Sequence, residues 1–339
     1  MTTAPPGAPQ RRATSPRSTD RPAHRRGRPM TASRRANRAG LAFVSPTFLV
    51  VLVVVILPIL WTVLLAFQDA KLVDIQGMGL FGNWSLDNFA QIFGSAGFWS
   101  SLGTTLIYTA GATAGSVVLG LIAALALRKP FRGRGLLRAA MLLPYVAPVV
   151  AVAFVWEVAL SPQYGVVNDW GRRLFGWDDP IAFLSTREYE VSLLGMHFDI
   201  PLALLTVIAF ECWRYFPFAF LFILARLQAV PHGLEEAALV DGATHTQRFR
   251  YVLLPQLMPV IALLCVLRFI LTFNKFDDVY LLTGGGAGTD IAAVRVYDFL
   301  TARYDVGAAA AQALVLAVSL MILLGFYFKF FGNKVQEES

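Results

Sequence analysis

Charged residues and cysteines are both scarce in this sequence. Of its 339 residues only 15% are charged and 56% are hydrophobic, whereas about 25% of the residues in an average soluble domain are charged. So much apolar surface excludes an intrinsically disordered chain, because disorder requires low hydrophobicity. The two cysteines, Cys212 and Cys265, lie inside apolar stretches, which excludes a disulfide-stabilised scaffold.

The motifs of nucleotide, metal and hydrolase chemistry are also missing. No lysine follows a glycine, so the phosphate-binding loop that ends in Gly-Lys-Ser/Thr is absent. The four histidines lie in an N-terminal tail and in loops, without the spacing of metal ligands, and no Gly-x-Ser-x-Gly elbow occurs. The glycine-rich stretch 284–288 follows an apolar run, which is typical of a flexible outer turn. The sequence therefore predicts no catalytic residues, no metal site and no cofactor, and favours a protein that is not an enzyme.

What the sequence does contain is long apolar runs. A helix needs roughly 20 apolar residues to cross a hydrocarbon core of about 30 Å. Six runs reach this length, at residues 41–67, 98–127, 136–160, 202–227, 255–282 and 307–331. In the second run, Gly111, Gly115 and Gly120 are small enough to let a neighbouring helix approach closely. We therefore expect an all-α membrane protein whose six transmembrane helices form one domain, residues 41–331.

The positions of lysine and arginine predict which side of the membrane each connection occupies. Twenty basic residues fall in or beside residues 1–40, 127–136, 228–254 and the C-terminal tail 332–339, and six fall in the other connections. Because cytoplasmic connections are enriched in Lys and Arg, both termini are expected in the cytoplasm. Residues 1–40 hold ten arginines, six prolines and one acid, which predicts a disordered tail near anionic membrane lipid. An inside-positive flank accounts for this charge without a nucleic-acid partner.

The connection 228–254 carries the most specific pattern in the chain, and it predicts a helix, a turn and a second helix. Pro231 suits a helix start, and Glu235 and Glu236 follow in the first turn, where the helix dipole favours anions. Gly242 supplies the break, and a second short helix is expected to end at Pro255. Taken alone, this pattern also fits an amphipathic surface helix between two spans.

The same connection resembles the signature loop of ABC importer permease subunits. The resemblance rests on Glu236-Ala237-Ala238, Gly242, and then Val252 and Leu254-Pro255 at the spacing of that loop, with valine in place of the usual isoleucine. Two other stretches are similar to the carbohydrate-uptake, maltose-type branch of the family: Leu-Pro-Tyr at 143–145 with a proline at 148, and 273–286 with its three glycines. The glycine-rich turn and residues 307–312 resemble the first of the two permeases in such transporters.

The resemblance implies an importer in the prokaryotic cytoplasmic membrane, with six spans of the type I permease fold. This chain would pair with a second permease as a heterodimer, with two cytoplasmic ATPases and with an extracytoplasmic solute-binding protein. It would form half of the path for a sugar or oligosaccharide, by alternating access. Connection 228–254 would be the coupling loop that docks on the ATPase through Glu235, Glu236, Ala237, Ala238, Asp241 and Gly242.

Ionisable side chains inside the spans are costly, so each needs a reason. The fourth span places Glu211, Arg214, Tyr215 and Phe218 on one helix face, and the fifth places Arg268, Thr272 and Lys275 on another. Two interpretations stay open. The faces could line a hydrophilic path, where Trp213, Tyr215 and Phe218 offer ring faces to a sugar. Alternatively, an interhelical ion pair such as Glu211 with Arg268 could only hold the spans together.

Several alternatives remain at this point. The charged faces leave room for another solute, such as a polyamine or a phosphorylated polyol, and a membrane channel or regulator without an ATPase is a different class of protein. The outer segment 161–201 could be a docking surface for a binding protein or a plain lid. Asp277 and Asp278 are expected to rim the outer entrance of the path.

Overall fold

The computed structural model describes residues 43–73, 84–193 and 196–336, and the predicted tail 1–40 lies outside them. Contacts divide the chain into two units, residues 1–58 and residues 59–339. In the first unit the described residues are helical and include a π-helical turn, η1 (Leu52–Ile56). The helix α2 (Leu57–Ala66) follows at the boundary between the units.

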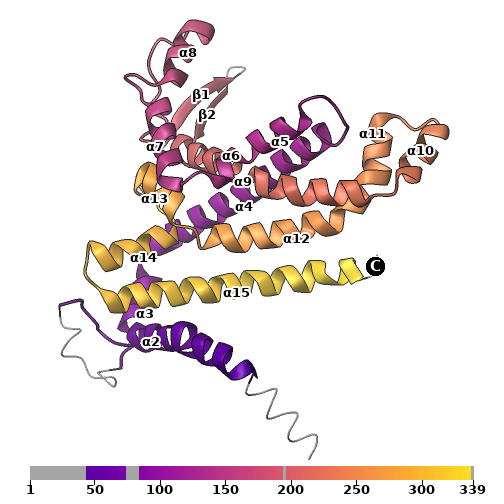
Figure 1. The fold of residues 1–339 in the computed structure, drawn as a ribbon. Coiled ribbons are helices and arrows are strands. Elements are labelled where there is room, and N and C mark those ends of the chain that lie inside the picture. The colour runs from indigo at the N-terminus through magenta and orange to yellow at the C-terminus, as the bar shows by residue number, and fades with distance from the viewer. Residues whose placement is uncertain (1–42, 74–83, 194–195, 337–339) are drawn as a thin grey trace, which may run out of the picture. The chain divides into compact units, whose positions relative to one another are not determined.

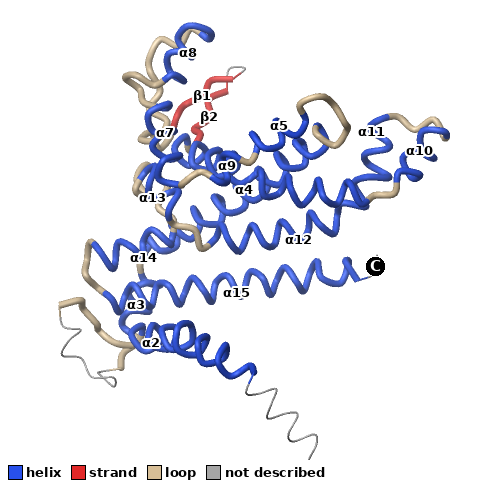
Figure 2. Tube along the Cα trace, viewed as in Figure 1, coloured by secondary structure: helices blue, strands red, loops and turns tan. Residues whose placement is uncertain are grey.

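The second unit is mainly helical, with one small antiparallel hairpin (Figures 1 and 2). The hairpin consists of β1 (Tyr189–Leu193) and β2 (Met196–Ile200). The helices are α3 (Asp87–Gly94), α4 (Ala96–Ala126), α5 (Arg134–Met141), α6 (Leu143–Val146), α7 (Val149–Leu160), α8 (Val166–Phe175), α9 (Leu202–Ala229), α10 (His232–Val240), α11 (His245–Arg248), the π-helical η2 (Phe249–Leu253), α12 (Leu254–Phe273), α13 (Asp277–Thr283), α14 (Ala292–Thr301) and α15 (Val306–Gln336).

Five helical segments among the described residues are long and apolar enough to cross a membrane. A sixth is obtained if the bent pair Arg134–Val146 and Val149–Leu160 counts as one span. The expected number of six is met only with this bent pair. The five are Phe43–Ala66, Ala96–Ala126, Leu202–Ala229, His245–Phe273 and Val306–Tyr327.

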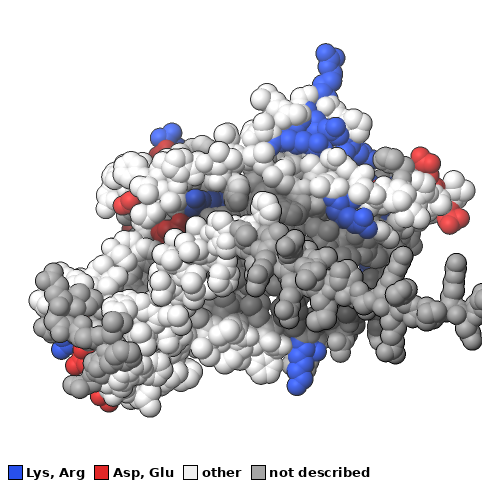
Figure 3. Space-filling view, turned by 60° about the horizontal axis from the view of Figure 1, so that its bottom comes forward, with Lys and Arg blue, Asp and Glu red and all other residues white. Residues whose placement is uncertain are grey.

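The outward surface of these spans is apolar, as a lipid-facing surface must be. Ile107 and Ile122 in α4 and Leu263 in α12 are more than half exposed. Figure 3 shows a face of the molecule that is mostly uncharged, with basic side chains gathered in a few places.

Helices α4 and α9 pack closely because α4 presents glycines to its partner. A Cβ atom added at Gly120 would lie 2.6 Å from the Cβ of Ala219 and 2.8 Å from the backbone nitrogen of Phe220. One added at Gly115 would overlap the sulfur atom of Cys212. The prediction that small residues in this run admit a neighbouring helix is confirmed. The same packing forms a buried cluster that α12 completes with Leu257 and Leu264.

The third predicted span is not straight, which corrects the expectation of one helix over 136–160. The helices on either side of Ala147 and Pro148 are bent by 95°. Pro148 has no backbone N–H and disfavours helical backbone in the residue before it, and Ala147 accordingly is extended, with ψ 144°. Proline therefore fixes the position of the break.

The fifth predicted span begins earlier and ends earlier than 255–282. Its helix starts after Thr244, whose hydroxyl accepts a hydrogen bond from the backbone N–H of Gln247 in a capping box. The helix then passes through Pro255, because the π-helical turn η2 precedes this residue, so the expectation of a helix ending there is wrong. It stops at Phe273 rather than at residue 282.

Segment 161–201 corrects the strictly all-α expectation, because it contains the hairpin β1–β2. The side chain of Asn168 in α8 organises this segment. Its Nδ2 donates to the carbonyl oxygens of Ser161 and Ile181, and its Oδ1 accepts from the N–H of Ile181. One buried amide thus ties α8 to the loop after it and to the end of α7.

Candidate functional site

Five charged side chains form one buried network between α9, α12 and α13. The Glu211 carboxylate accepts hydrogen bonds from Arg268 Nη2 at 2.7 Å and from Lys275 Nζ at 2.9 Å. Arg214 Nη1 lies 2.6 Å from Asp278 Oδ1, and Lys275 also pairs with Asp278. Glu211, Asp278 and Arg268 are at most 1% exposed. Three cations therefore share two carboxylates, and both carboxylates are fully buried.

The network exists because α12 ends at Phe273. Residues 274–276 separate α12 from α13. Lys275 therefore lies in this turn, and Asp278 lies in the first turn of α13. A straight helix to residue 282 would carry these two side chains further along the span. The expectation that Asp278 rims the entrance is wrong, because this side chain is fully buried in ion pairs.

The ring of Tyr215 is surrounded by the three cations of the network. Lys275 Nζ lies 3.6 Å from the ring centroid, and the guanidinium carbons of Arg268 and Arg214 lie 4.2 Å and 5.3 Å from it. Cations at these distances are attracted by the ring quadrupole. Tyr215 also meets the ring of Tyr145 edge-on, at 5.6 Å between centroids. The aromatic ring is thus part of the charge network.

The structure brings most of the predicted path residues together but places Trp213 elsewhere. Trp213 packs against Trp156 at 5.6 Å and Phe210 at 6.4 Å between centroids, on another side of α9. Phe218 joins the aromatic group through Tyr145, at 6.0 Å. Thr272 is fully buried, and its hydroxyl has no hydrogen-bond partner within the described part of the chain.

A cavity of about 430 Å³ borders the network. Its lining includes Tyr215, Arg268, Asn274, Lys275 and Asp277. The charged atoms that pair inside the network are therefore next to a space that a solute of modest size could enter.

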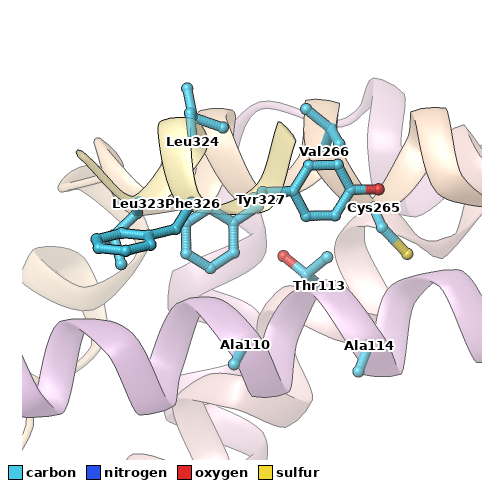
Figure 4. Close-up of a pocket in the computed structure, with 10 residues that line it drawn as sticks. Ala110, Thr113, Ala114, Cys265, Val266, Leu323, Leu324, Phe326 and Tyr327 are labelled. Atoms are coloured by element: carbon cyan, nitrogen blue, oxygen red, sulfur yellow. The ribbon is translucent and has the colours of Figure 1, made fainter. Parts of the chain in front are cut away.

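A second cavity of about 430 Å³ lies between α4, α12 and α15 and is almost entirely apolar (Figure 4). Ala110, Thr113 and Ala114 form its side on α4, with Cys265 and Tyr327 opposite (Figure 4). None of the predicted path residues line it. Its chemistry does not suit a hydrophilic solute.

The predicted coupling loop forms a helix and a left-handed turn beyond the ends of α9 and α12 (Figure 1). Gly242 has φ +77°, a conformation that favours glycine, and this confirms the predicted break. Glu236, Ala237, Asp241 and Gly242 are exposed, and Ala238 is half-buried. Four of the six predicted coupling residues are thus exposed on this projection.

Glu235 is arranged differently from its neighbours. Its two carboxylate oxygens accept hydrogen bonds from Arg128 Nη1 and Nη2, each at 2.8 Å. Arg128 directly follows the C-cap of α4, more than a hundred residues away in the sequence. Sequence reasoning missed this pair, and it placed Asp278 at the entrance of the path rather than in the buried network. The two predicted polar faces hold three cations but only one carboxylate, and this imbalance was the signal that could have indicated a further carboxylate.

Comparison with known proteins identifies the family. Residues 116–336 match the family described as binding-protein-dependent transport system inner membrane component. The inner membrane ABC transporter permease protein YcjO of Escherichia coli is 40% identical over 240 residues, which are 70% of this chain and 76% of that protein. The trehalose/maltose transport system permease protein MalF of Thermococcus litoralis is 32% identical over 279 residues, 81% and 88% of the two chains.

A solved structure shares the fold. It belongs to a bacterial ABC transporter involved in the import of the acidic polysaccharide alginate, and it superimposes with a TM-score of 0.70 at 22% identity. The match covers 88% of this chain and 98% of the other. The resemblance seen in the signature loop is therefore confirmed by independent means. This chain belongs to the family of binding-protein-dependent transport system inner membrane components, the permease subunits of ABC transporters.

Proposed function

We propose that this chain is one of two permease subunits of an ATP-driven importer that carries a sugar or oligosaccharide across the cytoplasmic membrane by alternating access. Relatives named as trehalose and maltose permeases support the solute class. The observation that carries the mechanism is the exposed helix α10 with its glycine turn, which follows α9 after two residues and leads through α11 and η2 into α12. Rocking of spans about a midplane site is the general form of alternating access.

The coupling surface is assigned to the exposed residues of the loop. Glu236, Ala237, Asp241 and Gly242 would dock on a partner ATPase, which would carry the nucleotide chemistry that this chain lacks. Arg226 in α9 donates to the backbone and side-chain oxygens of Gln256, so the inner ends of α9 and α12 are held together at the base of the loop. A push on α10 would therefore move both spans. This arrangement requires both termini to lie in the cytoplasm, together with the coupling loop.

The solute path is assigned to the cavity beside the charge network. Its wall offers the amide of Asn274, the ammonium of Lys275 and the ring of Tyr215, which the ring of Tyr145 contacts edge-on. Sugar hydroxyls suit such donors, and sugar rings suit aromatic edges. Within this assignment Glu211 and Arg268 hold the wall in place and Trp213 supports it from another side of α9.

A phosphorylated polyol is a second candidate solute. The sn-glycerol-3-phosphate permease UgpA of Agrobacterium fabrum is 31% identical over 262 residues, 76% of this chain and 84% of that protein. The three cations against two carboxylates in the network would suit an anionic solute. The named sugar relatives favour the neutral sugar.

Reconstitution of the complete transporter tests the proposal. The chain is assembled in proteoliposomes with its second permease, its ATPase and its binding protein, and uptake of labelled trehalose, maltose and sn-glycerol-3-phosphate is measured with and without ATP. We expect uptake of a disaccharide that requires ATP. Equal uptake in the absence of nucleotide would contradict the proposal, and uptake of the phosphate ester alone would replace the sugar with the second candidate.

A further inference from the structure

The pair between Arg128 and Glu235 connects two cytoplasmic connections that are far apart in the sequence. Arg128 Nη1 donates to Glu235 Oε1 and Arg128 Nη2 donates to Glu235 Oε2, each at 2.8 Å. The two side chains are only 23% and 27% exposed. A two-point contact of this kind fixes orientation as well as distance, and partial burial reduces screening by water. This differs from an exposed single-contact ion pair, which contributes little.

The Arg128 end of the pair belongs to a compact junction. Arg138 in α5 donates to the carbonyl oxygen of Leu127 at 2.7 Å, and Arg134 donates to the carbonyl oxygen of Arg128 at 3.2 Å. These carbonyls lie at the C-terminal end of α4, where a helix leaves acceptors free and favours cations. Helices α4 and α5 are therefore joined at the residue that holds Glu235.

The Glu235 end belongs to the coupling helix. Helix α10 packs against α11 and η2, which are parts of the same loop. Within the described part of the chain, Glu235 makes the side-chain hydrogen bonds that connect α10 to a residue outside the loop. It directly precedes the exposed Glu236, so it lies in the same helical turn as the surface assigned to the ATPase.

We propose that the Arg128–Glu235 pair is a positioning link that passes movement of the coupling helix to α4 and α5. The inference rests on the proposed function of α10 and adds a second route to it. The first route runs along the chain into α9 and α12. The second runs through the ion pair into the junction of α4 and α5, and α5 leads through α6 to the bend at Pro148 in the third span. Glu235 thereby acts through Arg128, and not as a contact to the ATPase.

The test compares single and paired substitutions in the complete transporter in proteoliposomes. The variants are Arg128→Lys, Arg128→Glu, Glu235→Gln and the charge exchange Arg128→Glu with Glu235→Arg. The measured quantity is solute taken up per ATP hydrolysed, together with the amount of ATPase that copurifies. The matched control is Asp169→Asn in α8, which removes an exposed ion pair of 3.0 Å with Arg173.

We expect Arg128→Glu and Glu235→Gln to lower uptake per ATP about five- to tenfold, within the range typical of coupling between sites. The ATPase should still copurify, and Asp169→Asn should leave the ratio unchanged. Arg128→Lys should give an intermediate loss, because lysine cannot make both contacts. The charge exchange should restore most of the ratio, because it forms the same ion pair with the charges reversed; a local loss of stability would instead lower the amount of ATPase that copurifies with the single variants.

Two results would overturn the link. Unchanged uptake per ATP in all single variants would show that the pair carries no movement. Loss of ATPase copurification in Glu235→Gln but not in Arg128→Glu would show that Glu235 contacts the ATPase directly. Failure of the proposed function is distinguishable, because the unsubstituted transporter would then show no ATP-dependent uptake, and both proposals would fall.

Discussion

The carboxylate of Glu211 in α9 and the guanidinium of Arg268 in α12 lie 2.7 Å apart, and both are buried. The same carboxylate also accepts from Lys275. One acidic side chain therefore pairs with two cations, Arg268 from α12 and Lys275 from the turn between α12 and α13. Loss of one partner from such a network leaves a buried charge unpaired, so the stability of the folded protein should fall by a measurable amount.

Replacement of Glu211 by glutamine should destabilise the protein by about 3 kcal/mol, because it leaves buried cations with one carboxylate fewer. Thermal unfolding in nanodiscs measures the effect. Glu211→Gln combined with Arg268→Gln restores the charge balance of the network and should recover part of the loss. If the double variant is less stable than the single one by the full cost of a second change, the two residues do not form an energetic unit.

Tyr215→Ala should weaken the network by about 1–2 kcal/mol, because it removes the ring that attracts three partly desolvated cations. Tyr215→Phe keeps the ring and is the matched control. Stability and uptake should both decline in the alanine variant and stay near normal in the phenylalanine variant. Equal losses in the two variants would assign the effect to the hydroxyl group instead.

Gly120→Val should prevent α4 and α9 from packing, at a cost of about 3 kcal/mol or more, because the added Cβ meets backbone atoms. Gly103→Val on the same helix is the control, since a Cβ at Gly103 has no atom within 4 Å. The yield of folded protein on size-exclusion chromatography measures both. A similar yield for the two variants would contradict the close packing of α4 and α9.

Gly242→Asp should abolish uptake while the chain itself remains folded. A Cβ at Gly242 meets nothing within 4 Å, so the substitution strains the left-handed turn, by about 1–2 kcal/mol, and adds bulk and charge to the docking surface. Gly176→Asp provides the control, because Gly176 has φ +66° and equally open space but lies in segment 161–201, away from the coupling loop. Normal uptake in Gly242→Asp would remove this turn from the coupling surface.

Much of the fold and part of the site followed from local pattern. Hydrophobic length predicted the spans, glycine spacing predicted the contact of α4 with α9, and the position of Gly242 predicted the turn after α10. These features depend on residues that are neighbours in the chain or share one helix face. Helical spacing also predicted that Glu211 and Arg214 lie on one face.

The remaining features depend on distant or competing interactions. The pairing of Arg128 with Glu235 joins two loops whose separation in sequence carries no periodic signal. Asp278 reaches the network only because α12 stops at Phe273, in the middle of an apolar run with no proline to mark the end. The bend at Pro148 was missed because hydropathy reports how long an apolar run is and not whether its helix changes direction. The proline was part of the quoted motif, but it was not used to predict a bend.

The bend at Pro148 divides the third predicted span into two short helical arms, neither of which is long enough to cross a bilayer alone. Val149–Leu160 has 12 residues, a length of roughly 18 Å, well short of a hydrocarbon thickness of about 30 Å. Along this arm Val150, Phe154 and Val155 are each more than 60% exposed. If the second permease proposed above packs against this arm, it would cover these apolar side chains and supply the helix length that a single arm lacks.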